Sequence, residues 1–432
     1  MKVALVHDYL SEFGGAERVL LALSEIFPKA PIYTAFVNKN SPAYARFKGK
    51  RIVTSWAQNI PFFSTKLYSP LRFLAPKIWN SFDFSEYDVV VTSASWFVTK
   101  GVLKRVRETE SKRVKDRERR PIEICYCHTP PRYLYGYATA GDIKRNFITR
   151  AYALLINHFM RVYDFEAAQR VDYFIANSYE VQSRIKKFYR RDSVVIYPPA
   201  FASSFAKASG FSEDKRLGSS SKRSLYSNSL DAEPYFLVVS RLVASKNVDV
   251  VVEVCAKLGL PLKVVGTGRE LEKLKKLAIK GAKKHSRSEV RVLSGEHSGS
   301  GAKSTVGFLG DVEDRELARL YQNCRAVIFA ASQEDFGIVP VEAMATGKPV
   351  IASAEGGVLE SVIDAIPAGK GKGTGVYFDP PTAGSLTLAI NNFVDLEKKG
   401  YFDAKFIKKH AQKFSKDRFK REILKFVEKK VR

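Results

Sequence analysis

Two glutamates frame the segment of this 432-residue chain that points most clearly to chemistry. Glu334 and Glu342 have seven residues between them and follow an apolar run that predicts a strand. The segment predicts a loop that opens a helix, and helical positions eight apart, a little over two turns, share one face. Glu334 would then lie near the backbone amides of Phe336, Gly337 and Ile338, which are free at a helix start. A carboxylate can accept from sugar hydroxyls while such amides bind phosphate or sugar oxygens.

Two cations follow the strand that opens the second half of the chain. Arg241 and Lys246 come directly after the apolar run 235–239. At the carboxyl end of a parallel strand, a planar guanidinium and a lysine point charge suit a diphosphate. The alternative interpretation is a pair of solvated surface cations.

Three residues of the first half occupy similar places. Gly14 and Gly15 lie between a strand predicted at 2–6 and a helix predicted at 16–27, where the backbone could approach an anion or simply turn tightly. His128 follows the strand predicted at 122–126 and precedes two prolines that fix the loop. A lone histidine is more often structural, but this position favours contact with a ligand.

The sequence gives no reason to expect a metal or another cofactor. It has no Asp-x-Asp, and no cluster of His, Cys and carboxylates has the spacing of metal ligands. It also lacks the G-x-S-x-G turn of a serine hydrolase. Gly266-Thr-Gly268 has no third glycine, so it predicts a strand-ending turn rather than a dinucleotide site.

Strands and helices that alternate along both halves must position these residues. Further strands are predicted at 88–92, 173–176, 262–265, 325–329, 349–352 and 376–378, and further helices at 148–170, 249–258, 270–279, 313–322 and 339–344. This alternation is typical of βαβ units and of doubly wound parallel sheets. Serine-rich, glycine-rich or charged segments at 104–120, 201–232, 280–304 and 368–374 predict insertions or linkers, and 402–432 predicts an amphipathic helix.

Composition and charge limit the function classes. The 71 basic and 45 acidic residues give a net charge of +26, which favours nucleic acid, anionic membranes or phosphorylated ligands. The four cysteines predict buried thiols and a reducing cytoplasm. Since no apolar run reaches the roughly 18 residues of a spanning helix and the start is not that of a signal peptide, we expect a cytoplasmic protein.

Taken together, these segments resemble the family-4 retaining glycosyltransferases over nearly the whole chain. The resemblance depends on Gly14-Gly15-Ala16-Glu17, Ser240-Arg241 with Lys246, the Gly307–Gly310 segment, the Glu334–Glu342 spacing and Gly356-Gly357. Within that family, 6–9 and 127–133 are most similar to bacterial O-antigen mannosyltransferases.

The resemblance implies an α/β fold with two doubly wound Rossmann-like domains that face each other across a cleft, the GT-B fold. We expect an acceptor-side domain at 1–200, a serine-rich insertion or linker at 201–232 and a donor-binding domain at 233–405. A helix at 406–432 would pack back on the first domain.

The resemblance also implies a role for each candidate residue. Arg241 and Lys246 would bind the donor diphosphate, Glu334 the donor sugar and Glu342 the ribose. The amides of Phe336, Gly337 and Ile338 would hold sugar and phosphate oxygens, and the backbone at Gly310 to Val312 would contact the base. Gly14 and Gly15 would approach the donor phosphates and the acceptor, and His128 would lie over the donor sugar. Among these, His128, Glu334, Arg241 and Lys246 form the expected catalytic set.

The implied function is a metal-independent, retaining transfer of a hexose, foremost mannose from GDP-mannose, to a lipid-linked or polysaccharide acceptor. The basic surface would then dock on the anionic inner face of the plasma membrane, with 104–120, Trp56 and Phe62-Phe63 as candidate contacts. One alternative is another GT-B enzyme that uses a UDP-sugar, either a transferase or an epimerase. The other is a nucleic-acid-binding protein, for which charge alone argues, since no binding module is found.

Overall fold

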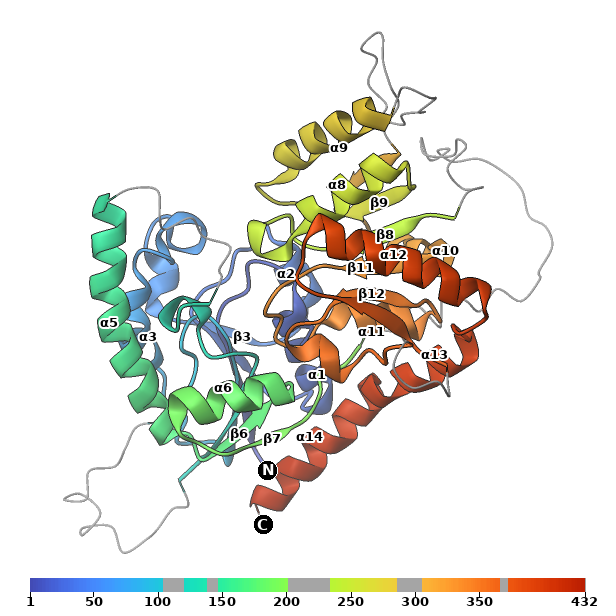
Figure 1. The fold of residues 1–432 in the computed structure, drawn as a ribbon. Coiled ribbons are helices and arrows are strands. Elements are labelled where there is room, and N and C mark those ends of the chain that lie inside the picture. The colour runs from blue at the N-terminus through green and yellow to red at the C-terminus, as the bar shows by residue number, and fades with distance from the viewer. Residues whose placement is uncertain (104–119, 138–146, 201–233, 286–304, 366–371, 432) are drawn as a thin grey trace, which may run out of the picture. The chain divides into compact units, whose positions relative to one another are not determined.

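The computed structural model describes residues 1–103, 120–137, 147–200, 234–285, 305–365 and 372–431 (Figure 1). The chain divides into two compact units. Unit 1 comprises Met1–Pro199 with Lys416–Arg432, and unit 2 comprises Ala200–Ser415. The chain therefore leaves unit 1 once and returns to it for a single helix.

Unit 1 is built on a parallel sheet of seven strands in the order β3-β2-β1-β4-β5-β6-β7. The strands are β1 (Val3–His7), β2 (Ile32–Thr34), β3 (Ile52–Thr54), β4 (Val89–Ala94), β5 (Ile122–Cys127), β6 (Tyr173–Ala176) and β7 (Ser193–Val195). Its α-helices are α1 (Gly15–Ile26), α2 (Pro42–Arg46), α3 (Ala75–Trp79), α5 (Phe147–Arg170), α6 (Tyr179–Tyr189) and α14 (Lys416–Val431).

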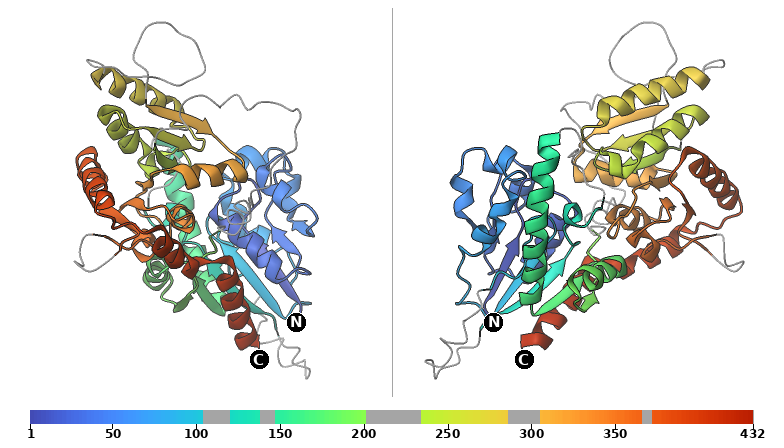
Figure 2. Two further views of the ribbon diagram at one scale, coloured as in Figure 1. Left: turned by 90° about the vertical axis from the view of Figure 1, so that its right-hand side faces the viewer. Right: turned by 60° about the vertical axis from the view of Figure 1, so that its left-hand side comes forward.

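Both faces of this sheet are buried, because successive residues of a strand point to opposite sides. Leu5 packs in a cluster with Leu23 of α1 and Phe419 of α14. The next residue, Val6, packs in a second cluster with Trp79 of α3. Helices therefore cover the sheet on both sides, and Figure 2 shows α5 as one uninterrupted rod alongside it.

Unit 2 contains a parallel sheet of six strands in the order β10-β9-β8-β11-β12-β13. The strands are β8 (Phe236–Val239), β9 (Leu262–Val265), β10 (Val306–Gly310), β11 (Ala326–Phe329), β12 (Val350–Ser353) and β13 (Gly375–Phe378). The α-helices are α8 (Val248–Leu258), α9 (Leu271–His285), α10 (Asp314–Asn323), α11 (Ile338–Ala345), α12 (Ala383–Lys398) and α13 (Ala404–Ala411). Val238 and Ile328 pack in one core with Val252 of α8 and Ile390 of α12, and Figure 1 shows α8 and α9 side by side.

Short helical turns of other types complete the two units. They are η1 (Trp56–Asn59), η2 (Phe63–Leu67), η3 (Arg72–Leu74), η4 (Arg132–Leu134), η6 (Ala244–Lys246), η7 (Gly357–Glu360) and η8 (Gln412–Phe414).

The strand order reverses once in each sheet, between β1 and β4 and again between β8 and β11. In open parallel sheets, ligands bind outside the carboxyl ends of the strands at such a reversal. Arg241 and Lys246 follow β8, and Glu334 follows β11. Arg241, Lys246 and Glu334 therefore lie at the reversal point of unit 2.

The predicted fold class, α/β with two doubly wound parallel sheets, is confirmed. The stretch predicted as one helix at 402–432 forms α13, η8 and α14, of which α13 belongs to unit 2 and α14 to unit 1. The predicted insertion at 201–232 lies outside the described residues, as do 286–304 of the segment predicted at 280–304, 104–119 of the charged segment at 104–120, and residues 368–371. The prediction for 280–285 was wrong, because these residues continue helix α9. Among the described helices, none has the length and hydropathy that a membrane span requires.

Candidate functional site

An ion pair joins the loops that follow β8 and β11 in unit 2. Lys246 Nζ donates to Glu334 Oε2, and both side chains keep less than a fifth of their surface exposed. The neighbouring Asn247 donates from Nδ2 to the Ala330 carbonyl at 3.0 Å and to Ser332 Oγ at 2.7 Å. Three hydrogen bonds therefore hold the β8 loop against the β11 loop. They bring together the lysine and the glutamate that the sequence predicts to act on one ligand.

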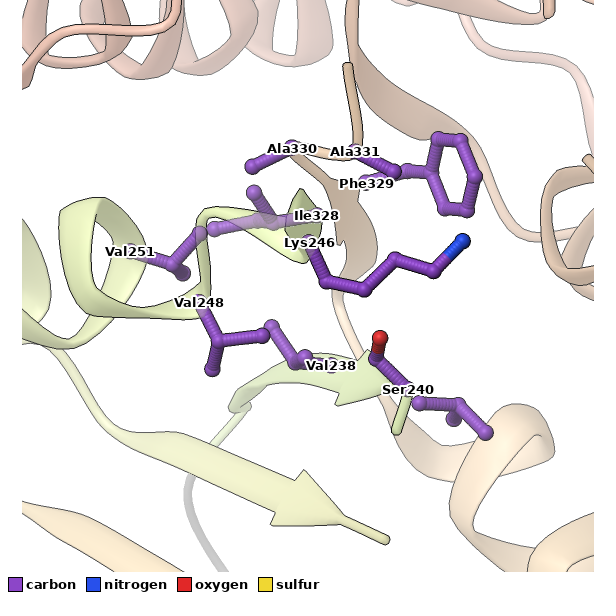
Figure 3. Close-up of a pocket in the computed structure, with 10 residues that line it drawn as sticks. Val238, Ser240, Lys246, Val248, Val251, Ile328, Phe329, Ala330 and Ala331 are labelled. Atoms are coloured by element: carbon purple, nitrogen blue, oxygen red, sulfur yellow. The ribbon is translucent and has the colours of Figure 1, made fainter. Parts of the chain in front are cut away.

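A small pocket lies beside Lys246, between the ends of β8 and β11 and the start of α8. Its lining is mostly apolar, with Val248 and Ile328 among the contributors. Figure 3 shows Lys246 and Ser240 as its polar side chains, with the lysine nitrogen at the far end of an extended chain. Arg241, the other predicted cation, is exposed beside them on the same loop. Lys246 and Ser240 therefore lie beside a packed apolar surface.

The loop after β11 turns into helix α11 through a left-handed glycine. Gly337 has φ +83° and is the residue before the helix, a conformation that a side chain would strain. Phe336 is buried and its ring lies 5.5 Å from that of Phe414, which fixes the loop from below. The loop thus places Phe336, Gly337 and Ile338 at the helix start, where backbone amides favour an anion.

Glu334 and Glu342 do not share a helix face. Glu334 lies in the loop before α11 and only Glu342 lies within the helix, so the helical spacing expected between them does not apply. Glu342 is 2% exposed, and its Oε2 accepts from the Tyr321 hydroxyl of α10 at 3.1 Å. The expected contact of Glu342 with a ribose stays a prediction.

Two glycines after β12 allow close packing against the Glu334 loop. A Cβ on Gly356 would lie 2.3 Å from the Glu334 carbonyl oxygen, and one on Gly357 would lie 2.3 Å from that of Asp335. The Gly357 amide donates to the Glu334 carbonyl at 2.9 Å. The glycine pair that the sequence singled out therefore shapes the backbone that carries Glu334.

Of the predicted base contacts, Gly310 is the last residue of the edge strand β10 and Val312 follows it. Gly310 has φ +68°, and its carbonyl accepts from the Gly266 amide at 2.7 Å. The turn at Gly266 in turn lies against Ser240, whose carbonyl oxygen would be 1.9 Å from a Cβ on that glycine. The predicted turn at 266–268 thus links the base segment to the loop of Arg241.

In unit 1, a chain of hydrogen bonds connects His128 with the Gly14-Gly15 loop. His128 Nε2 lies 2.8 Å from Ser93 Oγ, which lies 3.1 Å from His7 Nδ1. His7 Nε2 lies 3.4 Å from Glu17 Oε1, and Glu17 Oε2 accepts from the Gly14 amide at 2.8 Å. The predicted residues of this unit therefore belong to one hydrogen-bonded group. Burial, with a further contribution from His7, lowers the pKa of His128 to about 4.

Sequence reasoning did not select Asp8, which organises the segment after β4. Its carboxylate accepts from the amides of Trp96 at 2.6 Å and Phe97 at 3.2 Å, and from the hydroxyls of Ser95 and Thr99. The available signal was its position directly after β1, at the reversal point of the sheet. His7 and Ser93 were also missed, because their pairing in register across β1 and β4 joins residues 86 positions apart.

The structure thus brings some of the predicted residues together in each unit, whereas Glu342 is buried against Tyr321 and Val312 lies after the edge strand β10. Lys246, Glu334 and the start of α11 meet in unit 2, with Arg241 on the same loop, while His128 and Gly14 meet in unit 1. Among the described residues, no cluster of three or more His, Cys, Asp or Glu side chains has an arrangement that could hold a metal ion.

Comparison with known proteins identifies the class of unit 2. Residues 226–414 match the family model described as glycosyl transferases group 1, so unit 2 contains a domain of this group. The chain is 25% identical over 283 residues to the α-1,3/1,6-mannosyltransferase ALG2 of Dictyostelium discoideum. That alignment covers 63% of this chain and 61% of the relative, less than two thirds of its length.

Two solved structures are similar over nearly their whole length. One is Alr3699/HepE of Anabaena in complex with UDP, with a TM-score of 0.64 and 17% identity over 99% of this chain and 100% of that one. The other is the sucrose-phosphate synthase of Thermosynechococcus elongatus, with a TM-score of 0.65 and 17% identity over 99% of each chain. At this identity, the two structures bear out the fold.

The first prediction concerns the glycine pair beside Glu334. Gly357→Ala should lower the free energy of unfolding by about 1–3 kcal/mol, because the methyl group meets backbone atoms and forces the loop to move. The control is Gly384→Ala in α12, whose Cβ would meet nothing within 4 Å and which should stabilise by up to about 1 kcal/mol. Urea denaturation followed by circular dichroism measures both, and equal stabilities would contradict the packing described.

The second prediction concerns the neutral state of His128. Its pKa is about 4 in the folded protein and about 6.5 when unfolded. Between these values only the unfolded chain takes up the proton, so stability present above pH 6.5 is lost as the pH falls. Linkage gives a loss of about 2 kcal/mol between about pH 7 and pH 5.

His128→Asn should remove this part of the pH dependence, while His158→Asn, at an exposed position of α5, should retain it. Urea midpoints at the two pH values measure the difference. If the urea midpoint of His128→Asn changes between the two pH values as much as that of wild type, the buried ring does not resist protonation.

Proposed function

We propose that this protein is a retaining glycosyltransferase that moves a hexose, foremost mannose from GDP-mannose, to a lipid-linked or polysaccharide acceptor in cell-surface glycan synthesis. The observation that carries the proposal is the Lys246–Glu334 pair at the reversal point of a sheet that lies in a glycosyl transferase group 1 domain. The similarity to a mannosyltransferase favours mannose as the sugar.

The charges of this site suit the departure of a nucleoside diphosphate. Transfer from a nucleotide sugar develops negative charge on the leaving diphosphate and positive charge on the anomeric carbon. Arg241 and Lys246 would stabilise the diphosphate more strongly in the transition state than in the ground state. Glu334 would accept from hydroxyls of the donor sugar, and the amides at the start of α11 would hold sugar and phosphate oxygens.

The ion pair keeps these two groups ready for a ligand. Without donor, each charge satisfies the other, which lowers the cost of holding both partly buried. A bound diphosphate would replace Glu334 as the ion-pair partner of Lys246, and Glu334 would then accept hydrogen bonds from the sugar. The remaining polar contacts of the loop, made by Asn247, would stay in place.

We propose a front-face displacement, in which the leaving phosphate accepts the proton of the acceptor hydroxyl. Such a route retains the configuration and needs no carboxylate nucleophile. The proposed route also needs no metal ion, because Arg241 and Lys246 supply the positive charge that stabilises the leaving diphosphate. His128 would contribute a neutral ring beside the donor sugar, and Gly14 and Gly15 a backbone that approaches the phosphates.

A UDP-sugar is the second candidate for the donor. The favouring observation is that the similar Anabaena protein was solved with UDP. The backbone of Gly310 to Val312, in which Gly310 has a left-handed conformation, would then select the base. This alternative keeps the site and the reaction and changes only the base and the sugar.

The third prediction tests the cations. In a thermal shift series at moderate salt, GDP should stabilise the wild type more than UDP does, by mass action. Lys246→Ala and Arg241→Ala should each lose about tenfold or more in affinity for the diphosphate, the value of a charge-assisted hydrogen bond. Lys257→Ala, which removes an exposed lysine of α8, is the matched control.

In a transfer assay, the same two variants should lose about 100-fold or more in kcat/KM. The unliganded melting temperature of Arg241→Ala should stay close to that of wild type, whereas that of Lys246→Ala should fall, because the partly buried Glu334 loses its partner. Full activity of both would overturn the assignment of the site. Selective stabilisation by UDP would replace the base and sugar but leave the reaction class in place.

We further propose that the enzyme works as a peripheral protein on the anionic cytoplasmic face of a membrane. Seven large apolar or aromatic side chains of α5 are exposed: Phe147, Tyr152, Leu154, Leu155, Phe159, Val162 and Phe165. At helical spacing they fall within one half of the helix surface, with the exposed Arg150 and Arg161 along one border and one exposed acid, Glu166, within that half. A basic rim beside an apolar stripe complements an anionic bilayer.

Of the membrane contacts expected from the sequence, Phe62 and Trp56 are exposed. Phe63 is buried, and its ring packs at 5.4 Å against that of Phe36, so it belongs to the core and is not a membrane contact. Residues 104–119 lie outside the described part of the chain.

The fourth prediction is that the double variant Leu155→Glu, Phe159→Glu binds anionic liposomes at least about tenfold more weakly than wild type, because it removes two apolar contacts and adds two repelled charges. Leu388→Glu, at a similarly exposed leucine of α12, should bind like wild type. Flotation at two salt concentrations measures binding. Equal binding by all three proteins would exclude α5 as the docking surface.

A further inference from the structure

The hydrogen-bonded group of unit 1 has a direction that its chemistry fixes. It runs from Glu17 through His7 and Ser93 to His128, over distances of 3.4, 3.1 and 2.8 Å. Three of its members lie at strand ends of one sheet, and His7 stands in register opposite Ser93. Glu17 belongs to the first turn of α1. His7 contributes both ring nitrogens and His128 its Nε2, and the serine hydroxyl joins the two rings.

An ionised carboxylate accepts hydrogen bonds only, so His7 must donate to Glu17 from Nε2. When His7 is neutral, its Nδ1 is then an acceptor and takes the proton of the Ser93 hydroxyl. Ser93 Oγ has its proton engaged there and accepts from His128, which must carry its own proton on Nε2. One carboxylate thereby determines which nitrogen of a ring three hydrogen bonds away is protonated.

Burial keeps His128 in the neutral form that this argument requires. The residue is 8% exposed and His7 is 1% exposed, and the pKa of His128 is lowered by burial first and by His7 second. With Nε2 directed to Ser93, the other nitrogen, Nδ1, keeps its lone pair. Among the described residues none donates to it.

We propose that Glu17, His7 and Ser93 are positioning residues that hold His128 as the Nε2–H tautomer and so present its Nδ1 as a hydrogen-bond acceptor. An acceptor matches a sugar hydroxyl and repels a phosphate oxygen. The inference rests on the proposed function for its ligand and refines it, because His128 then selects the hydroxyl-bearing part of the donor. We call the hydrogen-bonded group of Glu17, His7, Ser93 and His128 the relay. It also couples the Gly14 loop to the His128 ring, since Glu17 accepts from the Gly14 amide with its second oxygen.

Glu17→Gln is the variant that tests the direction. A glutamine has one acceptor oxygen, and the contact to Gly14 at 2.8 Å is shorter than the contact to His7 at 3.4 Å. The oxygen should therefore keep the Gly14 amide and turn the NH₂ group towards His7. His7 Nε2 must then accept, its Nδ1–H donates to Ser93, and Ser93 donates to His128. Both rings should change to the Nδ1–H tautomer while the helix cap stays intact.

The measurement is long-range ¹H–¹⁵N NMR of the full chain labelled with ¹⁵N-histidine, at about pH 8, well above the ordinary histidine pKa of about 6.5. The chain has six histidines, and the variants His7→Gln and His128→Gln assign the two signals. Glu25→Gln is the matched control, because it removes another carboxylate from α1 whose partners are Lys416 and Lys420.

We expect the Nε2–H pattern for both rings in wild type and in Glu25→Gln, and the Nδ1–H pattern for both in Glu17→Gln. In a Ser93→Ala background, Glu17→Gln should no longer affect His128. A His128 signal that is the same in wild type and Glu17→Gln, or an Nδ1–H signal in wild type, would overturn the relay.

The transfer assay reports on the proposed function separately. Glu17→Gln should lower kcat by about tenfold, the value of one neutral hydrogen bond to the substrate. A tautomer change without any transferase activity in wild type would keep the relay and reject the function. Activity without the tautomer change would keep the function and reject the relay.

Discussion

A parallel sheet that is buried on both faces can offer polar groups to a ligand only at the ends of its strands. Buried apolar side chains dominate both sheets, as Leu5 and Val6 show on the two faces of β1 and Val238 and Ile328 show in the core of unit 2. The backbone of each strand is engaged in its ladder, so the chemistry gathers where the strands stop. His7 and Asp8 lie there in unit 1, and Arg241 and Lys246 lie there in unit 2. The sites described above follow from this restriction, because each reversal of strand order opens space beside those ends.

The same restriction explains how much the sequence could predict. Strands such as Val3–His7 and Ala326–Phe329 are runs of buried β-branched and apolar residues, and their pattern is local. Residues that follow such a run are candidates for the site by position alone, which is how Lys246, Glu334 and His128 were found. Strands β2, β3 and β7 have only three residues each, too few for a periodic pattern to stand out.

Contacts between distant parts of the chain were beyond sequence reasoning. The pairing of His7 with Ser93 depends on the register of β1 against β4, and that of Lys246 with Glu334 joins residues 88 positions apart. The burial of Glu342 depends on α10, which supplies the Tyr321 hydroxyl. The spacing of two glutamates suggested a shared helix face, but Gly337 starts the helix after the first of them. Glycine at that position was visible in the sequence, whereas its left-handed conformation was not.

Helix α14 sets the order in which the chain can complete its parts. Phe419, Ile423 and Val427 belong to the same core cluster as Leu5 and Leu23, and all of unit 2 lies between them in the sequence. During synthesis, the first 199 residues emerge well before the helix that covers one face of their sheet. Domains generally fold as units during translation, yet here the unit that begins first is finished last. A ribosome-bound chain that has just completed unit 2 therefore still exposes the apolar surface over β1, until residues 416–431 arrive.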